Sequence, residues 1–295
     1  MSGFVRNSRP IWRGVARALV AGAALFCAAP VAGAEVGAGG PRRVVSINLC
    51  TDQLAMMLAA EGQLVSVSRI AADPNVSPMA EQARGYVINH GQAEEIYMLD
   101  PDLVLAGAFT PRHTVDMLEN LGIRVEVFDI TTSVDGVRGQ LRKMGTALHR
   151  QAAASEMIAE FDARLAQLRR PVQTRPSAML YYANGYTSGE QTLANDILDL
   201  AGFRNSAIAA GYEWGMKMPL EVLALSNPDL VITTQPYPGG SRAEDVMIHP
   251  AVRALRASRA ATAMTDSDWV CGTPFVLRAA ERLAQVRRAI TGEAR

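Results

Sequence analysis

The sequence contains the segment EEIYMLDPDLVL at residues 94–105, and its pattern returns at residues 221–232 as EVLALSNPDLVI. The two segments align without a gap, which places Glu94 on Glu221 and one Pro-Asp pair on the other. Each copy predicts the end of a helix, a turn at Pro-Asp and a short apolar strand. Repeats of about 20–50 residues are typical of solenoids, so a single echo this far along the chain indicates two similar lobes instead.

The residues around the first copy predict an α/β lobe over residues 42–136. Strand-like segments alternate with helix-like segments, and Gly62 and Gly122 stand where helix C-terminal caps are expected. A loop rich in Asn, Pro and Gly is expected between the second strand and Gly91. This alternation predicts a parallel sheet covered by helices on both faces. The predicted strands are VVSINL, LVSVSRI, DLVLAG and RVEVFDI, and the predicted helices are TDQLAMMLAAEG, AEEIYML and RHTVDMLENLG.

The middle of the chain follows a different pattern. Over residues 137–170 the apolar residues recur mostly three or four positions apart, which predicts one long helix, or two in series, without a strand partner. A second α/β lobe follows over residues 176–295, and Gly202 is expected to cap its first helix. We therefore predict an α/β fold of two parallel-sheet lobes joined by one long α-helix, with a ligand cleft between the lobes.

Residues 1–34 predict a signal peptide. Residues 6–17 carry four arginines and no acid, residues 18–27 are apolar, and small residues lead up to cleavage after Ala34. A lipoprotein anchor at Cys27 is the alternative, but the bulky Phe26 stands where such signals usually carry a small residue. No later apolar stretch is long enough to span a bilayer, so we expect an exported and soluble mature chain.

Charge and motifs exclude several classes of function. The leader holds four of the 29 basic residues, so the mature chain has 29 − 4 = 25 basic and 29 acidic residues, a net charge of 25 − 29 = −4. A chain without a basic surface is a poor partner for nucleic acid. G-x-S-x-G, H-E-x-x-H, Walker A and paired C-x-x-C motifs are absent from the sequence. We expect neither catalysis nor a cofactor. The alternatives are an exported α/β enzyme, or a bare-metal scavenger that uses His90 and His113 with a carboxylate.

The candidate binding residues follow the predicted strands. In parallel α/β lobes, ligands bind beyond the carboxyl ends of the strands. The loops at those ends hold much of the aromatic content of the chain together with two arginines, a combination that suits a large, flat or anionic ligand. The candidate ligand-binding residues are Cys50, Arg69, His90, Phe109, Arg112, Tyr182, Tyr186, Trp214, Tyr237, Asp268, Trp269 and Cys271.

These segments together resemble the periplasmic substrate-binding proteins of ABC importers that carry ferric siderophores, haem and cobalamin. The resemblance covers essentially the whole mature sequence. It implies two α/β lobes linked by one long helix, a ligand held between them, a periplasmic location and a monomer that performs no chemistry. The segments that carry it are VVSINLCTDQLAMMLA, AEEIYMLDPDLVLAG, YTSGEQTLANDILDLAGF, MPLEVLALSNPDLVIT and TDSDW.

The resemblance also implies a reason for the repeat. In these importers a glutamate on each lobe meets a basic pocket on each of two permease subunits, and Glu94 and Glu221 occupy the matching positions here. The implied partners are therefore an inner-membrane permease with its ATPase. The alternative is that a glutamate early in a helix simply favours the helix dipole.

The resemblance leaves the ligand open. Cobalamin binders of this type carry tryptophans where this chain has Ile88 to His90 and Gly107 to Phe109. This departure places a ferric siderophore first, cobalamin or another corrinoid second, and haem or another metal complex third.

Two cysteines remain after the leader is removed, Cys50 and Cys271. An oxidising compartment favours pairing, and a bond between these residues would tie the two lobes together across the ligand site. Pairing requires Cα atoms within about 7 Å of each other, which sequence does not establish. Two free thiols that contact a soft metal or the chelate, or a buried inert thiol at Cys50, are the alternatives.

Overall fold

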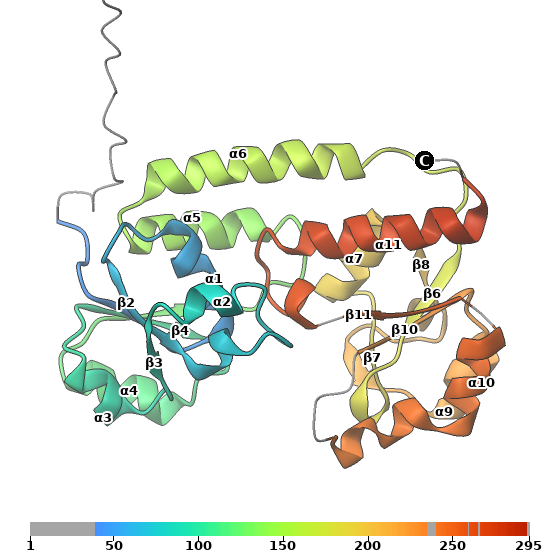
Figure 1. The fold of residues 1–295 in the computed structure, drawn as a ribbon, viewed down its shortest axis with the longest axis horizontal. Helices are drawn as coiled ribbons and strands as arrows, with labels where there is room; N and C mark the ends of the chain where they lie inside the picture. Colours follow the sequence, from blue (N-terminus) through green and yellow to red (C-terminus); the bar gives the residue numbers. More distant parts are fainter. Residues whose placement is uncertain (1–38, 235–239, 259, 265, 294–295) are drawn as a thin grey trace, which may run out of the picture. The chain divides into compact units, whose positions relative to one another are not determined.

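The computed structural model describes residues 39–293 with the exception of 235–239, 259 and 265 (Figure 1). The predicted signal peptide, residues 1–34, lies outside this part of the chain, as does Tyr237. Within the described residues no helix combines the length and the apolar character needed to cross a membrane.

The N-terminal sheet is built from five parallel strands in the order β3-β2-β1-β4-β5. Successive side chains of a strand point to opposite faces, so Val44 and Val45 enter two different apolar clusters, one on each face. This two-sided burial confirms the prediction of a covered parallel sheet. The strands are β1 (Val44–Ser46), β2 (Leu64–Ser68), β3 (Val87–Asn89), β4 (Leu103–Gly107) and β5 (Val125–Phe128).

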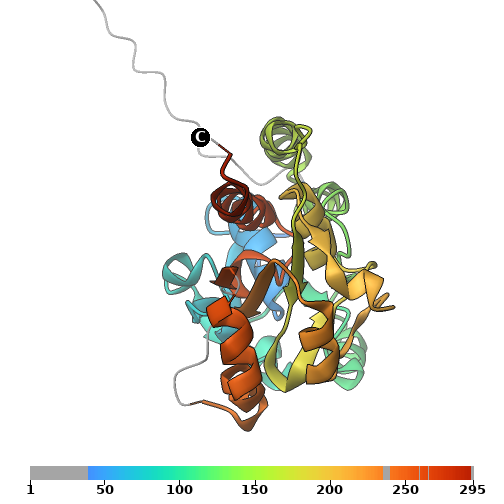
Figure 2. The same cartoon turned by 90° about the vertical axis from the view of Figure 1, so that its right-hand side faces the viewer.

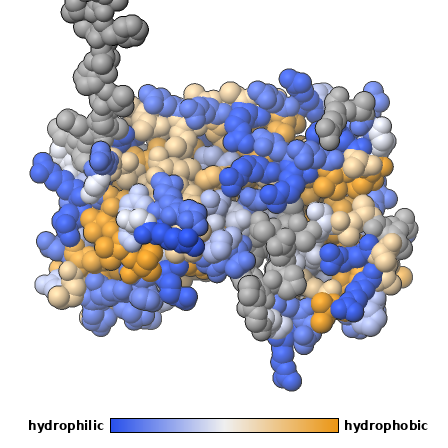
Figure 3. Space-filling view, viewed as in Figure 1, coloured by the Kyte–Doolittle hydropathy of each residue, from blue (hydrophilic) through white to orange (hydrophobic). Residues whose placement is uncertain are grey.

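Helices on both faces cover this sheet, namely α1 (Leu49–Leu58), α2 (Ala80–Ala83), α3 (Ala93–Met98) and α4 (Arg112–Asn120). The prediction of a plain loop up to Gly91 is wrong, because that stretch contains α2 and β3. β3 is only three residues long and lies at the sheet edge, where Val87 is half exposed, so it shows no readable alternation. Figure 3 shows apolar side chains grouped on this part of the N-terminal lobe.

Two of the three predicted glycine caps are confirmed. Gly122 and Gly202 have φ of 82° and 84° and follow the last turns of their helices, where only a residue tolerant of the left-handed region fits well. The prediction for Gly62 is wrong. α1 already ends at Leu58, and Gly62 is a turn residue ahead of β2.

The segment between the lobes forms two helices, α5 (Val137–Ala147) and α6 (Gln151–Leu168). The chain reverses between them at His149, whose φ is 56°. Gly145 lets the two helices approach closely, because a Cβ at that position would lie 2.5 Å from the Cβ of Ala154. The longer helix, α6, spans about 27 Å at the usual rise per residue, enough to reach from one lobe to the other.

The C-terminal sheet is also parallel, with the strand order β11-β10-β6-β8. Its strands are β6 (Ser177–Leu180), β8 (Arg204–Asn205), β10 (Leu230–Thr234) and β11 (Ala260–Met264). Its helices are α7 (Leu193–Leu200), α8 (Ser206–Ala209), α9 (Leu220–Ser226), α10 (Pro250–Ser258) and α11 (Val276–Thr291). A separate antiparallel pair, which sequence analysis missed, consists of β7 (Tyr186–Ser188) and β9 (Gly215–Lys217).

The repeated segment forms the same structure in both lobes. α3 and α9 begin at matching positions of the repeat, and so do β4 and β10. Even the backbone of the turn matches, because Asp100 and Asn227 both adopt left-handed conformations, with φ of 49° and 42°. The two short side chains tolerate that region better than most residues. Figures 1 and 2 place α3 and α9 on one side of the molecule, while α5, α6 and α11 lie on the opposite side.

The aspartate of each Pro-Asp pair holds the neighbouring strand. The carboxylate of Asp102 accepts hydrogen bonds from the backbone N–H groups of Arg42 and Arg43, at 2.7 and 3.0 Å, just before β1. The carboxylate of Asp229 accepts hydrogen bonds from the backbone N–H and the hydroxyl of Ser177, at 2.8 and 2.7 Å, at the start of β6. The Pro-Asp repeat therefore has a structural role in each sheet.

Candidate functional site

The strand order of each sheet defines where a ligand would bind. In the N-terminal sheet the chain adds β2 on one side of β1 and β4 on the other, so the loops that follow β1 and β4 diverge. β6 and β10 stand in the same relation in the C-terminal sheet. Such a switch point leaves a crevice beyond the carboxyl ends of the strands, where open α/β sheets bind their ligands.

A cavity of about 310 Å³ lies at the switch point of the N-terminal sheet. The segments that follow β1, β4 and β5 supply most of its lining, Ile70 and Gln140 add to it, and Val270 and Gly272 come from the C-terminal lobe. Its volume is at the lower end of the range for small-molecule sites. The cavity therefore lies between the two lobes and has room for one side of a larger ligand.

Four large apolar side chains from four different loops line this cavity and remain exposed. Their exposed fractions are 45% for Ile70, 84% for Phe109, 57% for Ile130 and 51% for Val270. A single exposed apolar residue needs no explanation, but several gathered around one cavity mark a binding surface. We call these four residues the apolar rim.

The lining carries little charge. Among the described residues of the cavity wall, none is Lys, Arg or His, and Asp129 is the one carboxylate. Asn48, Thr51, Thr131 and Gln140 add neutral hydrogen-bonding groups. An anionic group against this described wall would therefore have no cationic side chain of the lining to pair with.

The floor of the cavity is held by a close backbone approach. The side chain of Asn48 caps α1 by accepting a hydrogen bond from the backbone N–H of Cys50 at 3.0 Å. A Cβ on Gly107 would lie 2.6 Å from two atoms of that Asn48 side chain. Glycine at position 107 is therefore what allows the ends of β1 and β4 to pack together here.

A buried carboxyl lies beneath this floor on α1. Asp52 is completely buried and accepts hydrogen bonds from the backbone N–H of Ser68, at 3.1 Å, and from the Ser68 hydroxyl. Burial raises the pKa of Asp52 to about 7, and the hydrogen bonds from Ser46 and Ser68 oppose that rise. The protonation state of Asp52 therefore changes near neutral pH.

The two cysteines form a disulfide. Their Cα atoms are 5.1 Å apart, and they are separated by 221 positions in sequence. Pairing was one of three possibilities that sequence left open, and the structure excludes both the free thiols and the inert buried thiol. Cys50 also lines the cavity, so the bond forms part of the wall.

Further contacts beside the disulfide join the lobes. The Thr273 hydroxyl donates a hydrogen bond to the side-chain oxygen of Gln53 at 3.2 Å, and both residues are buried. A Cβ on Gly272 would lie 2.2 Å from the Cβ of Thr131, so that contact also requires glycine. The lobes are therefore tied together tightly at this edge of the cavity.

The predicted aromatic residues fall into two groups. Tyr182 and Trp269 pack edge to face with ring centroids 6.1 Å apart, and Trp269 is buried against the core. Tyr186 and Trp214 belong to the β7–β9 pair or its approach and are about half exposed. Of the aromatic candidates that the structure describes, Phe109 alone lines the cavity. The ligand contacts of the others stay predictions.

The charged candidates mainly contact their own neighbours. Asp268 is buried and pairs with Arg282 of α11 at 2.9 Å. His90 lies 3.2 Å from Glu95, and Arg112 pairs with Asp116 at 3.1 Å on the surface of α4. Arg69 is exposed beside Ile70 of the apolar rim. The structure gathers none of these four in the described cavity wall, and their ligand roles stay predictions.

Sequence analysis missed several lining residues. It chose aromatic, charged and sulfur-containing side chains, whereas much of the wall consists of small polar or aliphatic residues such as Asn48, Ile70 and Thr131. Ile130 is the last residue of the predicted strand RVEVFDI, and Thr131 directly follows it. The rule that ligands bind after strand ends would have found both.

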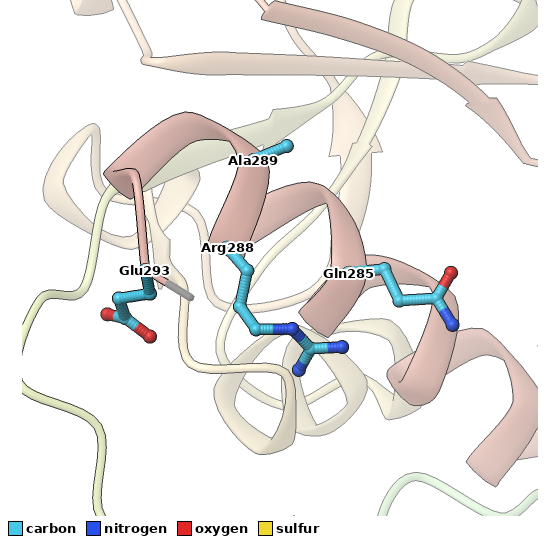
Figure 4. A pocket seen from close by; sticks show the side chains of 4 residues that line it. All are labelled: Gln285, Arg288, Ala289 and Glu293. Carbon is cyan, nitrogen blue, oxygen red and sulfur yellow. The ribbon is translucent and has the colours of Figure 1, made fainter. Parts of the chain in front are cut away.

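A larger cavity of about 640 Å³ lies elsewhere, at the C-terminal end of α11 (Figure 4). Gln285, Arg288, Ala289 and Glu293 line it. None of these described lining residues lies at the end of a strand.

Comparison with known proteins identifies the type of fold and of sequence. A family model described as "Periplasmic binding protein" matches residues 44–263. Two curated relatives, both named "Cobalamin-binding protein" and both from Halobacterium salinarum, are 32% identical over 205 residues. That match covers 65% of this chain and 54% of each relative, so the chain spans about half the length of the relatives it matches.

Solved structures share the fold. The periplasmic heme-binding protein RhuT from Roseiflexus sp. RS-1 has a TM-score of 0.70 at 20% identity, over 85% of this chain and 99% of that one. The vitamin B12 binding protein BtuF of Vibrio cholerae has a TM-score of 0.64 at 20% identity, over 86% and 99%. A Fe3+-hydroxamate transport protein from Saccharomonospora viridis has a TM-score of 0.65 at 22% identity, over 84% and 94%. They match the predicted two-lobe α/β fold.

Proposed function

The chain belongs to the periplasmic binding protein family, and from this premise we propose that it captures a metal chelate and delivers it to the permease of an ABC importer. The chelate we propose is a corrinoid of the cobalamin type. The ligand would lie between the lobes, against the apolar rim. Binding without chemistry is the function proposed, and the exported enzyme is not favoured by any described feature of the cavity.

The absence of Lys, Arg and His from the described cavity wall is the observation that carries the choice of ligand. A corrinoid has a wide face with methyl groups and an edge of neutral amides, which suits the apolar rim and the side chains of Asn48, Thr131 and Gln140. Haem carries two carboxylates and ferric tricatecholates carry several negative charges. The described wall offers no cation for either. The ligand order favoured by sequence alone, with a siderophore first, is therefore reversed in this proposal.

The curated relatives support the same choice, since the proteins 32% identical to this chain are named for cobalamin. A ferric trihydroxamate is the second candidate, because it is a neutral chelate and the same wall admits it. One of the structures that share the fold comes from a hydroxamate transport system.

Titration of the purified mature chain tests the proposal. Intrinsic fluorescence would be followed against cyanocobalamin, a ferric trihydroxamate, a ferric tricatecholate, haemin and zinc. We expect saturable quenching by cyanocobalamin and, if the second candidate holds, by the trihydroxamate instead. Saturation only by haemin or by the tricatecholate would overturn the argument from charge. Saturation by zinc alone would favour the bare-metal scavenger.

Substitution of a residue of the apolar rim tests whether the ligand binds at this cavity. We expect Phe109→Ala to weaken chelate binding by about 1–3 kcal/mol, the range for loss of an aromatic anchor that becomes buried on binding. Val87→Ala is the matched control, because Val87 is an exposed apolar residue of the same lobe that does not line the cavity. Equal affinity of both variants and the parent would place the ligand elsewhere.

Delivery is proposed to use the repeated helices. Glu94 and Glu221 hold the second positions of α3 and α9, and both side chains are exposed. Carboxylates at two like surfaces suit a permease of two like subunits, each with a basic pocket. Export of the chain, as a monomer cleaved near Ala34, belongs to the same proposal. N-terminal sequencing of the periplasmic protein tests that part.

A further inference from the structure

Three large apolar side chains are far more exposed than the others in the described part of the chain. Leu225 is 85% exposed, Phe109 84% and Met98 80%, whereas the next value is 57%. Phe109 belongs to the apolar rim of the cavity. Met98 and Leu225 align with each other in the repeat, so they occupy the same position on α3 and on α9.

The helix geometry places each of them beside a carboxylate. Met98 follows Glu94 by four residues, and Leu225 follows Glu221 by four residues. Residues four apart on a helix are neighbours on one face. Each short helix therefore presents a negative charge and an exposed apolar side chain together.

The opposite faces of the two helices also match. Ile96 on α3 and Leu223 on α9 correspond in the repeat, and both are fully buried. Burial of these residues fixes the rotation of each helix on its sheet, and so it fixes which side chains face outward. Packing of the buried faces therefore sets the outward exposure of Met98 and Leu225 in both helices.

Other corresponding positions of α3 and α9 differ in the charge or the size of their side chains. Glu95 and Tyr97 of α3 correspond to Val222 and Ala224 of α9. An isolated exposed leucine or methionine is ordinary on a protein surface. An apolar residue kept at the same outward position of both lobes, while its neighbours differ, indicates that two similar surfaces are recognised.

We propose that Met98 and Leu225 are the apolar anchors of two equivalent docking sites, one on each lobe. The occupant is a membrane protein with two like subunits, each of which offers a small apolar socket beside a cationic group. Figures 1 and 2 place α3 and α9 on the same side of the molecule, as simultaneous docking requires. This inference rests on the proposed delivery to a permease and adds the apolar contact to it.

The carboxylate and the apolar side chain of each docking site have different roles. An exposed carboxylate steers the approach and sets the orientation, whereas burial of an apolar anchor lowers the rate of dissociation. Tyr97, half exposed beside Met98, enlarges the apolar surface on the N-terminal lobe, while Ala224 adds little on the other. Loss of Leu225 therefore removes a larger share of its site than loss of Met98 does.

The test uses Met98→Gln and Leu225→Gln, singly and together, in the full-length chain. Glutamine keeps a similar length and a similar helix propensity while it removes the apolar surface. Met117→Gln is the matched control, since Met117 is an exposed methionine on the neighbouring helix α4. Cyanocobalamin affinity, melting temperature and uptake of labelled cyanocobalamin would be measured in each, the last in cells in which the variant replaces the parent gene.

We expect unchanged affinity and melting temperature, with uptake lowered about 5- to 50-fold by Leu225→Gln and less by Met98→Gln. The double variant should be the lowest, and Met117→Gln should equal the parent. Uptake by both variants at the parent level, while the parent itself restores uptake to a deletion strain, overturns the inference and leaves the proposed function intact. A parent that restores no uptake overturns the proposed function for this ligand and the inference with it. If sedimentation shows a parent dimer that the variants lose, a second copy of this chain is the occupant and the proposal is wrong.

Discussion

The two lobes share a scaffold and differ in what they add to it. The segments after β1, β4 and β5 of the N-terminal lobe form most of the described cavity wall, whereas the described part of the C-terminal lobe adds only Val270 and Gly272. The helix, the Pro-Asp turn and the strand of the repeat are nevertheless the same in both. The repeat therefore serves the sheets and the outer surface, while the described cavity wall comes from segments that do not repeat.

The same comparison separates two roles for acidic residues. Asp102 and Asp229 hold neighbouring strands through backbone hydrogen bonds, while Glu94 and Glu221 face outward on the matched helices. Asp52 has no counterpart in the repeat and is buried beneath the cavity. Substitutions of these acids and of the disulfide cysteines test these roles. They are given in decreasing order of the change that each should cause.

Reversal of both matched glutamates should have the greatest consequence. In the variant Glu94→Arg/Glu221→Arg, a like-charge contact with a basic pocket would cost several kcal/mol at each lobe. We expect chelate affinity to stay at the parent value, because neither residue lines the cavity, and uptake to be abolished. Each single reversal should leave one lobe able to dock and give intermediate uptake. Parent-level uptake in cells that carry the double reversal would exclude the docking role.

Removal of the disulfide should come second. The cysteines that it joins are separated by 221 positions, and the chain-entropy model gives about 5 kcal/mol for a loop of that order. The variant Cys50→Ser/Cys271→Ser should therefore unfold at a much lower denaturant concentration than the parent. The parent measured with reductant should approach the variant. An unchanged midpoint would show that the other contacts between the lobes already hold them in place.

The pH dependence of the free energy of unfolding should reveal the raised pKa of Asp52. Burial raises its pKa to about 7 from an unfolded value of 3.8, so the folded state holds the proton more tightly than the unfolded state. This contribution is fully present below pH 3.8 and is lost as the pH rises through about 7, for a total on the order of 4 kcal/mol.

Asp52→Asn isolates this effect. The amide oxygen can accept the hydrogen bond from the Ser68 backbone N–H, and the amide nitrogen can donate to the Ser68 hydroxyl. We expect the variant to gain stability relative to the parent as the pH rises from about 5 to 8. Parallel stability curves for the two proteins over that range would show that Asp52 titrates in its ordinary range.

The mildest changes should come from the strand-holding aspartates. Asp102→Ala and Asp229→Ala each remove two hydrogen bonds to a carboxylate, and we expect each to lower the free energy of unfolding by about 1–3 kcal/mol. Asp116→Ala is a control, because Asp116 is an exposed acid paired across a surface turn of α4. Similar losses for the first two variants, measured by denaturation, would support equivalent roles. A large loss in one lobe alone would break the symmetry between them.

Much of the fold could be predicted because its signals are local. The apolar strands, the left-handed glycines at 122 and 202 and the matched Pro-Asp turns are visible in the sequence. β3 and the β7–β9 pair escaped prediction because each strand is only three residues long, too short for a period of two to show. The break between α5 and α6 depends on one residue, His149, in a left-handed conformation.

The site was less predictable because the fold brings its residues together from separate loops, and no sequence pattern marks them. Phe109 and Cys50 line the cavity, but Asp268 pairs with Arg282, and Ile70 and Val270 line the cavity from loops of different lobes. The domain boundaries at residues 136, 170 and 176, and the signal peptide, stay predictions.

By itself, the sequence determined the two-lobe parallel architecture, the matched helix–turn–strand units and the family resemblance. Hydrophobic periodicity and turn chemistry act over a few residues and are written directly in the chain. Only the tertiary structure decided that Cys50 and Cys271 pair, that Asp52 is buried and titrates near neutral pH, and that the described cavity wall lacks cations. Each of these facts depends on distances between segments far apart in the chain, which close packing fixes and no local pattern encodes.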